Sequence, residues 1–383
     1  MKKILAMLLA LVMVLGLAAC GAPAAEAPAA SEAAYKVAMV TDYGDITDQS
    51  FNQTTYEACK AYAEANNVEF TYYKPAGDSD AERVAMIEKA VDEGYNVIVL
   101  PGFAFAAAIA TAAPQYPDVK FIALDVSEFD LTSAGLTAET MTNVYSAVYQ
   151  EELSGYMAGY AAVKLGYTKL GFLGGMAVPA VQKFGYGFVQ GADAAAKELN
   201  ITVDMNYIYG GLFYGTPDIS AVMDTWYQGG TEVVFACGGG IYTSAVDAAK
   251  KVEGAKVIGV DVDQAGVIAN YAGMSDKSLT VTSAMKGLYP TTVDTLTDVI
   301  NNGNWAKYAG KVATLGLVSG DDPTANYVQI PMESTQWSDT FTQDDYKAMV
   351  KAMFDGTIVV SGDVSAEPAV TNVNVDYQGQ IVG

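Results

Sequence analysis

Polar and aromatic side chains in this chain gather directly after apolar, β-prone runs. Asp42 follows the first such run, and Phe51 and Asn52 come soon after it, where a helical pattern begins. Asp125 and Asp261 each end a later run. An ionised carboxylate only accepts hydrogen bonds, and an aromatic face stacks on a flat ring. This set is therefore suited to a neutral ligand that carries hydroxyl groups and a planar ring.

The second half of the chain adds candidates in the same setting. They lie after or at the end of further apolar runs: Phe213, Gly238, Gly239 and Lys286. Glycines either let a ligand approach the backbone closely or simply permit a tight turn between strand and helix. Phe51 and Phe213 also fit a role as core aromatics, and Lys286 fits a role as the ion-pair partner of an aspartate. The residues alone leave these alternatives open.

The composition excludes several kinds of chemistry. The chain has no histidine, which rules out Ser-His-Asp and Cys-His nucleophile systems and any His-ligated metal site. No G-x-x-x-x-G-K-S/T motif is present to cradle a nucleoside triphosphate. Asp261 and Asp263 together supply too few oxygen ligands for Ca²⁺. We therefore expect no cofactor, no metal and no catalytic residue.

Alternating strand and helix patterns must position the candidate side chains. The first half shows strands over 36–40, 69–73, 96–100 and 120–125, with helices over 49–66, 80–93 and 104–113. The second half shows strands over 169–173, 202–208, 232–236, 256–260 and 279–283, with helices over 150–165, 181–199, 219–228, 243–252 and 288–301. Such alternation predicts parallel βαβ units in two similar α/β halves, and ligands bind at the carboxyl ends of the strands in such sheets.

The N-terminal residues indicate export and lipid attachment. Two lysines and an apolar run precede Leu17-Ala18-Ala19-Cys20-Gly21, which has the form of a lipobox, so we predict a signal peptide over 1–19 and lipidation of Cys20. The Ala/Pro/Ser/Glu-rich stretch over 20–35 is predicted to be a disordered tether. An ordinary secretory signal with an incidental cysteine is the alternative. Either interpretation places the protein outside the cytoplasm, and the lipobox fixes it to the cell membrane.

The net charge limits the partners. Loss of residues 1–19, which contain two lysines and no acids, changes the formal charge from −23 to −25. So acidic a surface disfavours nucleic acid and adsorption to anionic lipid. We expect membrane contact through the lipid only, no nucleic acid, and a monomer. Cys59 and Cys237 are expected to be buried thiols rather than a disulfide.

Three ordered motifs resemble one known family. They are T-D-x-G-x-x-x-D-x-S-F-N at 41–52, G-F-x-G-G-M followed by P, F and G-F within 171–188, and G-V-D-x-D-Q at 259–264. Together they resemble the basic membrane protein (BMP) lipoproteins, which are substrate-binding proteins of ABC importers and include purine-nucleoside receptors. The similarity runs from about residue 36 to about residue 290 and continues more weakly to the end.

The resemblance implies a type I periplasmic-binding-protein fold. In this fold two doubly wound parallel-sheet lobes are joined by a three-stranded hinge and hold the ligand in the cleft between them. We expect one lobe to comprise 36–147 plus 281–305 and the other to comprise 148–280 plus 306–383.

The resemblance also implies roles for individual residues. Phe51 and Phe213 would stack on the two faces of a base, and Asn52 would bind its edge. The ribose region would be lined by four residues, Asp42, Asp125, Asp261 and Lys286. Gly238 and Gly239 would offer backbone contacts. Val126 stands where the family often has a second acid, and Tyr43 and Asp45 stand where small residues are common, which changes the setting of base and sugar.

The function implied is capture of a nucleoside, with purines favoured, and its delivery to an ABC permease and ATPase complex. A receptor for another flat hydroxylated ligand or for a sugar is one alternative. A nucleoside-hydrolase-like enzyme is another, because the run from Asp42 to Asp48 is similar to the metal-binding aspartates of such enzymes. The missing histidines and the absence of a tight D-x-D-x-x-x-D-D run argue against it. We therefore expect a binding protein and not an enzyme.

Overall fold

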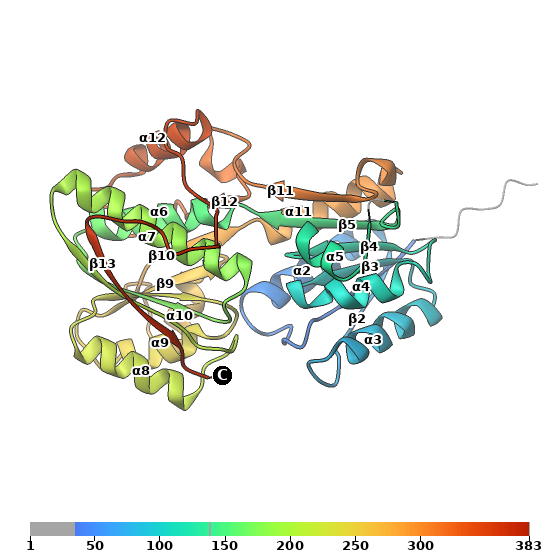
Figure 1. The fold of residues 1–383 in the computed structure, drawn as a ribbon, viewed down its shortest axis with the longest axis horizontal. Helices are drawn as coiled ribbons and strands as arrows, with labels where there is room; N and C mark the ends of the chain where they lie inside the picture. The colour runs from blue at the N-terminus through green and yellow to red at the C-terminus, as the bar shows by residue number, and fades with distance from the viewer. Residues whose placement is uncertain (1–34, 138, 383) are drawn as a thin grey trace, which may run out of the picture. The chain divides into compact units, whose positions relative to one another are not determined.

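Two β-sheets, each covered by helices, organise the residues that the computed structural model describes, which are 35–137 and 139–382 (Figure 1). The predicted signal peptide, Cys20 and almost all of the tether lie outside these residues. No helix among the described residues is long and apolar enough to cross a membrane. Cys59 and Cys237 are both buried and unpaired, as expected.

The first sheet consists of parallel strands. Its order is β11-β5-β4-β3-β1-β2, with bounds β1 Lys36–Val40, β2 Glu69–Tyr73, β3 Val97–Pro101, β4 Lys120–Leu124, β5 Val144–Tyr149 and β11 Lys311–Leu315. Alternate side chains face opposite cores, because successive residues of a strand point to opposite sides. Val37 and Met39 pack with α2 (Phe51–Asn66) and α11 (Leu288–Leu296). Ala38 and Val40 pack on the other side with α3 (Asp80–Asp92) and α4 (Ala106–Ala112).

The second sheet has the order β12-β10-β9-β8-β6-β7-β13. The bounds are β6 Lys169–Gly174, β7 Val203–Tyr209, β8 Val233–Cys237, β9 Lys256–Asp261, β10 Thr280–Lys286, β12 Val328–Gln329 and β13 Val373–Gln380. One core contains α6 (Glu151–Lys164), α7 (Pro179–Leu199) and α12 (Gln343–Phe354). The other contains α8 (Pro217–Gln228), α9 (Tyr242–Ala249) and α10 (Ala265–Ala272).

The two sheets repeat one topology. The order β2-β1-β3-β4-β5 in the first corresponds to β7-β6-β8-β9-β10 in the second. This confirms the predicted α/β fold with two doubly wound lobes. The predicted lobe boundaries are wrong at two strands, however. β10 hydrogen-bonds to β9 and so belongs to the second sheet, whereas β11 pairs with β5 over Lys311–Leu315 and belongs to the first.

The chain crosses between the lobes three times, after β5, after β10 and after β11. The crossings are hydrogen-bonded to one another: Gln150 N donates to Leu315 O at 2.9 Å, and Gly287 N donates to Tyr327 O at 2.6 Å. These three segments form the hinge. Glu151 begins α6 at the first crossing, and Lys286 ends β10 at the second.

Helices α6 and α7 pack with their backbones in direct contact. A Cβ atom added at Gly155 or Gly159 of α6 would lie 2.2 Å or 2.1 Å from a carbonyl oxygen of α7. A Cβ added at Gly187 or Gly191 of α7 would lie 2.1 Å or 2.0 Å from a carbonyl oxygen of α6. Small residues four apart on facing helices allow such an approach. This packing fixes where α6 begins and therefore where Glu151 lies.

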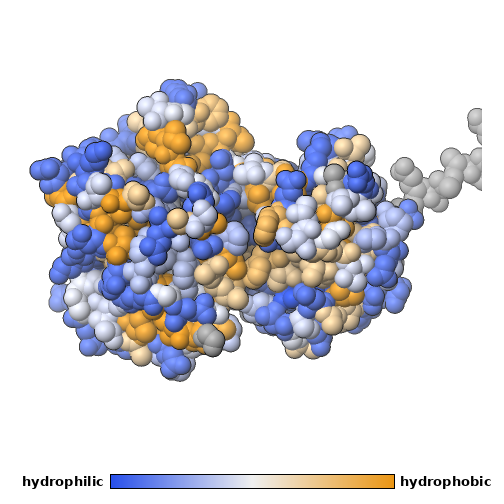
Figure 2. Space-filling view, viewed as in Figure 1, coloured by the Kyte–Doolittle hydropathy of each residue, from blue (hydrophilic) through white to orange (hydrophobic). Residues whose placement is uncertain are grey.

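The last part of the chain wraps the second lobe. After α12 it continues to β13, which pairs in parallel with β7 and forms an edge of the second sheet (Figure 1). Figure 2 shows apolar residues at the surface over α12, and Phe354 and Val359 are among the exposed apolar residues. The sequence patterns did not predict that this last segment pairs with β7.

Candidate ligand-binding site

A cavity of about 450 Å³ lies between the lobes at the carboxyl ends of the strands. All nine predicted ligand-binding residues line it: Asp42, Phe51, Asn52, Asp125, Phe213, Gly238, Gly239, Asp261 and Lys286. Both lobes contribute, because β1, β3 and β4 end on one side and β6, β8 and β9 end on the other. The volume falls within the range of pockets that enclose small organic ligands.

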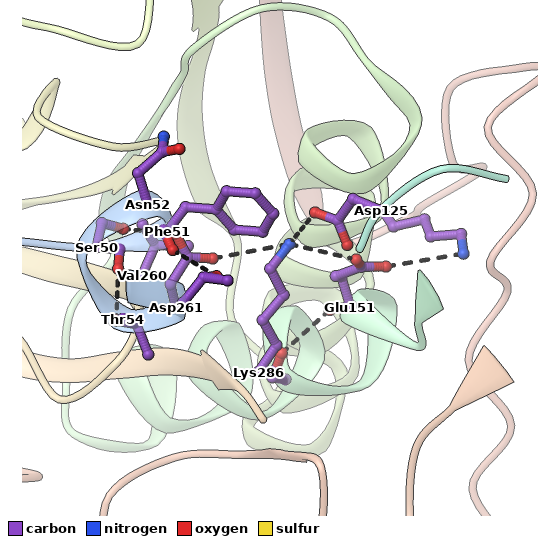
Figure 3. Close-up of polar contacts among 12 residues, drawn as sticks. Ser50, Phe51, Asn52, Thr54, Asp125, Glu151, Val260, Asp261 and Lys286 are labelled. Carbon is purple, nitrogen blue, oxygen red and sulfur yellow. Dashed lines mark hydrogen bonds and ion pairs between the residues drawn. The ribbon is translucent and has the colours of Figure 1, made fainter. Parts of the chain in front are cut away.

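A buried charge cluster occupies the hinge side of the cavity (Figure 3). The Lys286 ammonium forms an ion pair with Asp125 and lies 3.6 Å from Glu151 Oε1 and 3.8 Å from Asp261 Oδ1. Its side chain is 3% exposed, and those of the three acids are no more than 10% exposed. Four elements, β4, β9, β10 and α6, therefore meet at one ammonium group.

The two aspartates of the cluster occupy equivalent places in the two lobes. Asp125 directly follows β4 and Asp261 ends β9, which is the counterpart of β4. Both residues have a left-handed backbone, with φ values of 62° and 66°. Aspartate adopts this conformation more readily than most residues do. The left-handed turn takes the chain out of the sheet, and both carboxylates reach the same lysine from opposite lobes.

Burial and charge act against each other in this cluster. Burial alone lowers the pKa of Lys286, but Asp125, Asp261 and Glu151 outweigh it, so the pKa of the lysine is raised and it stays charged. Burial raises the pKa of Glu151 to about 8, although Lys286 opposes the shift. The pKa of Asp261 is also raised by burial, against Lys286 and a hydrogen bond from Ser50. Near neutral pH, Glu151 therefore holds a proton for much of the time.

Replacing Glu151 by glutamine should flatten the pH dependence of stability. The folded-state pKa lies above the ordinary value, so the folded protein keeps a proton that the unfolded chain loses between about pH 4.5 and pH 8. Stability contributed by this proton is lost as the pH rises through that window, with a slope of up to about 1.4 kcal/mol per pH unit. Glu151→Gln should remove this part of the slope in urea unfolding. The exposed Glu64→Gln serves as control, and equal slopes in wild type and Glu151→Gln would contradict the assignment.

The two predicted stacking aromatics come from opposite lobes. Phe51 begins α2, and the Lys286 ammonium lies 4.8 Å from its ring centroid. The ring of Phe213 packs on two glycines, since a Cβ at Gly175 or Gly238 would lie 2.4 Å or 2.8 Å from its Cδ1 atom. The glycine pattern after β6 and β8 thus makes room for an aromatic ring at the cavity wall, in addition to allowing the turns.

Asp42 holds the loop after β1 in shape. Its Oδ1 accepts backbone hydrogen bonds from Tyr43 and Gly44, both at 2.7 Å, and a 3.3 Å hydrogen bond from Asn52 Nδ2. The amide oxygen of Asn52 is buried without a partner, as is Oδ1 of Asp125. Both atoms are acceptors on residues that line the cavity, so a ligand with hydroxyl or N–H donors has two acceptors to satisfy.

Asp48 accepts hydrogen bonds from backbone N–H groups at the start of helix α2. Its carboxylate accepts from the backbone N–H groups of Ser50, Asn52 and Gln53 at 2.9, 3.0 and 3.1 Å. Burial raises its pKa to about 6 against these hydrogen bonds. The Asp48 carboxylate therefore stabilises the start of α2.

The lobes also contact each other directly across the cleft. Ser50 Oγ donates to Asp261 Oδ2 at 2.5 Å, and Gln264 Nε2 donates to Gln49 O at 3.1 Å. The Tyr43 hydroxyl lies 3.6 Å from the sulfur of Met176. These contacts join the loop that begins α2 to the loops after β6 and β9.

Several residues of the cavity wall were not predicted as site residues, and they include Glu151, Lys183 and Phe184. Lys183 Nζ lies 3.7 Å from Glu151 Oε2 and donates to Tyr149 O at 3.1 Å. The pair of acids that begins α6, Glu151 and Glu152, was the available signal for Glu151. Of the residues that depart from the family pattern, Tyr43 and Asp45 line the cavity, whereas Val126 is buried in the first lobe.

The family follows from a match over most of the chain. The family model described as Bmp, ABC transporter substrate-binding protein PnrA-like, matches residues 35–356. The chain belongs to the Bmp family. It is therefore an ABC transporter substrate-binding protein.

Relatives and solved structures agree with membership in the Bmp family. The ABC transporter nucleoside-binding protein BmpA of Lactococcus lactis is 28% identical over 299 residues, which is 74% of this chain and 80% of that protein. Basic membrane protein A of Borreliella burgdorferi is 29% identical over 60% of this chain and 64% of its own length. An ABC transporter solute-binding protein from Aeropyrum pernix has a TM-score of 0.66 at 21% identity and covers 86% of this chain and 88% of its own. The last likeness shows the type I fold.

Proposed function

We propose that this protein is a lipid-anchored, extracytoplasmic receptor that binds a nucleoside, with purines favoured, and delivers it to an ABC permease and ATPase complex. The observation that carries the proposal is one cavity in which two aromatic rings from opposite lobes and a set of carboxylates converge. Lipidation of Cys20 would hold the monomeric receptor beside its permease and would be its contact with the membrane.

The chemistry of the cavity supports a neutral ligand with a planar part and a hydroxylated part. Phe51 and Phe213 offer π faces to a base. Asp125 and Asp261 offer acceptors for ribose hydroxyl groups near Lys286. A nucleoside combines both parts without charge. The relative from Lactococcus lactis, described as nucleoside-binding, supports the same assignment.

Nucleosides should bind far more tightly than their monophosphates. Seven acids line the cavity, and Lys286 is already surrounded by three of them. The seven are Asp42, Asp45, Asp48, Asp125, Asp130, Glu151 and Asp261. Because like charges brought together cost several kcal/mol, we expect inosine to bind at least about 100-fold more tightly than inosine 5′-monophosphate. Isothermal titration calorimetry measures the ratio, with guanosine, adenosine and uridine to test the purine preference.

The same titration distinguishes the alternatives. Ribose binding as tightly as inosine would make the protein a sugar receptor and remove the role of the two aromatics. A preference for riboflavin would replace the nucleoside by another flat hydroxylated ligand. Chromatography of the recovered inosine tests the enzyme alternative, since release of free hypoxanthine would overturn the receptor function.

A further inference from the structure

The loop that carries Phe213 is held in place from three directions. It connects β7 to α8 through residues 210–216. On one side, Gly210 N and Gly211 N donate to the carbonyl oxygens of Gly174 and Gly175 at 2.7 and 2.9 Å, which ties the loop to the end of β6. On a second side, the carbonyl oxygen of Phe213 accepts a 2.8 Å hydrogen bond from the backbone N–H of Gly240, in the glycine loop after β8.

The third support comes from the far end of the chain. Ile381 N donates to Tyr209 O at 2.9 Å, and Val382 N donates to Gly210 O at 3.2 Å. These two residues continue β13, whose parallel register with β7 ends with Gln380 opposite Tyr209. The strand pairing therefore delivers residues 381–382 to the point where the loop begins.

The start of β13 is anchored independently of the loop. Oδ1 of Asp193, on α7, accepts hydrogen bonds from the backbone N–H groups of Thr371 and Asn372 at 2.9 and 2.6 Å. The pairing then shifts register between Tyr377 and Gln380. The strand is thus fixed at its beginning and bends near its end, where it meets the Phe213 loop.

Gly211 shows how closely the loop and the chain end fit together. Its φ is +84°, and a Cβ added there would lie 1.9 Å from the carbonyl oxygen of Val382. A side chain at this position would push residues 381–382 away from the loop as well as strain the backbone. The match to the Bmp family ends at residue 356, so this support is supplied by a segment outside that match.

We propose that β13 and residues 381–382 form a brace that positions the Phe213 loop, so that this segment sets the affinity for a planar ring without touching the ligand. The proposal rests on the function proposed above. Tyr209 and Gly210, which the brace holds, lie within four residues of Phe213 along the chain. Gly211 and the end of the brace are positioning residues, whereas Phe213 is the residue that meets the ring.

A chain that ends at Gln380 tests the brace. It keeps the paired part of β13 and loses both hydrogen bonds to the loop, so inosine affinity in calorimetry should fall about 3- to 10-fold, equivalent to one or two hydrogen bonds. In a Phe213→Ala background the same truncation should have no further effect, because residues that act as a unit are not additive. Ile381→Ala, which keeps both backbone hydrogen bonds, is the matched control and should bind as the full chain does.

Gly211→Ala provides a second, independent variant. It should weaken inosine binding in the full chain and weaken it less in the chain ending at Gln380, where Val382 is absent. Unchanged affinity of the truncated chain, or a truncation effect that adds fully to that of Phe213→Ala, overturns the brace. Failure of the full chain to bind any nucleoside overturns the proposed function instead, so the two failures are distinguishable.

Discussion

Replacing Lys286 by methionine should lower the free energy of unfolding by about 3 to 5 kcal/mol, because it leaves a set of buried acids without their cation. Asp125, Glu151 and Asp261 all lie within 4 Å of the ammonium group. Methionine keeps most of the length of the side chain and removes the charge together with its hydrogen bonds. Nucleoside binding should be lost as well, since repulsion between the lobes' aspartates opposes closure. Urea unfolding at pH 7 measures the first effect and calorimetry measures the second.

Two comparisons show whether charge is the cause. The double variant Lys286→Met with Asp125→Asn should recover a large part of the lost stability, because one of the unbalanced acids is removed. Stability of Lys286→Met alone should also rise as the pH is lowered and the acids take up protons. Lys307→Met is the matched control: its partner Asp298 is 2.7 Å away, but Lys307 is 65% exposed, so water and salt screen the pair and only a small loss is expected. A loss for Lys286→Met as small as that of the control would mean that the cluster contributes little.

Gly187→Val should prevent the second lobe from packing and lower stability by about 4 kcal/mol or more, which places it among the largest single-residue effects. The new Cβ would lie 2.1 Å from the carbonyl oxygen of Glu152, and the obstacle is backbone that no rotamer change can move aside. The helices must separate, which opens the core between them. Circular dichroism during thermal unfolding measures the loss.

Gly77→Val is the control for the added side chain, because a Cβ at Gly77 meets nothing within 4 Å. It should change stability by no more than about 0.5 kcal/mol, as surface substitutions usually do. A Gly187→Val protein as stable as Gly77→Val would show that α6 and α7 can move apart at little cost, contrary to their tight packing in the structure.

Much of the fold could be predicted because its signals are local. Apolar runs of five or six residues separated by amphipathic helices indicate parallel strands, and the order of the polar clusters indicates which strand ends meet. Asp125 and Asp261 could be predicted as neighbours in space because each follows the corresponding strand of its lobe. All nine predicted residues line the cavity, and the family resemblance supplied their individual assignments.

The remaining features depend on long-range contacts that leave weak local signals. Residues 280–286 and 311–315 look alike as apolar runs, and only the pairing of each with its neighbour decides its lobe. Glu151 is part of the site because α6 starts at the hinge, not because its local sequence is polar. The addition of β13 to β7 joins residues 170 positions apart, as in the pairing of Val373 with Val203, and no periodicity foretells such a partner.

The glycine contacts between α6 and α7 have a mechanical consequence. Where side chains separate two helices, a change of rotamer can accommodate a small displacement of one helix. Here the two backbones are in direct contact, so a displacement of one helix must move the other. α6 begins at the first crossing with Glu151, and α7 carries Lys183 and Phe184 at the cavity wall. A shift of the hinge segment after β5 therefore also moves Lys183 and Phe184 at the cavity wall. Helices α6 and α7 move as one rigid body, which couples bending of the hinge to the shape of the ligand cavity.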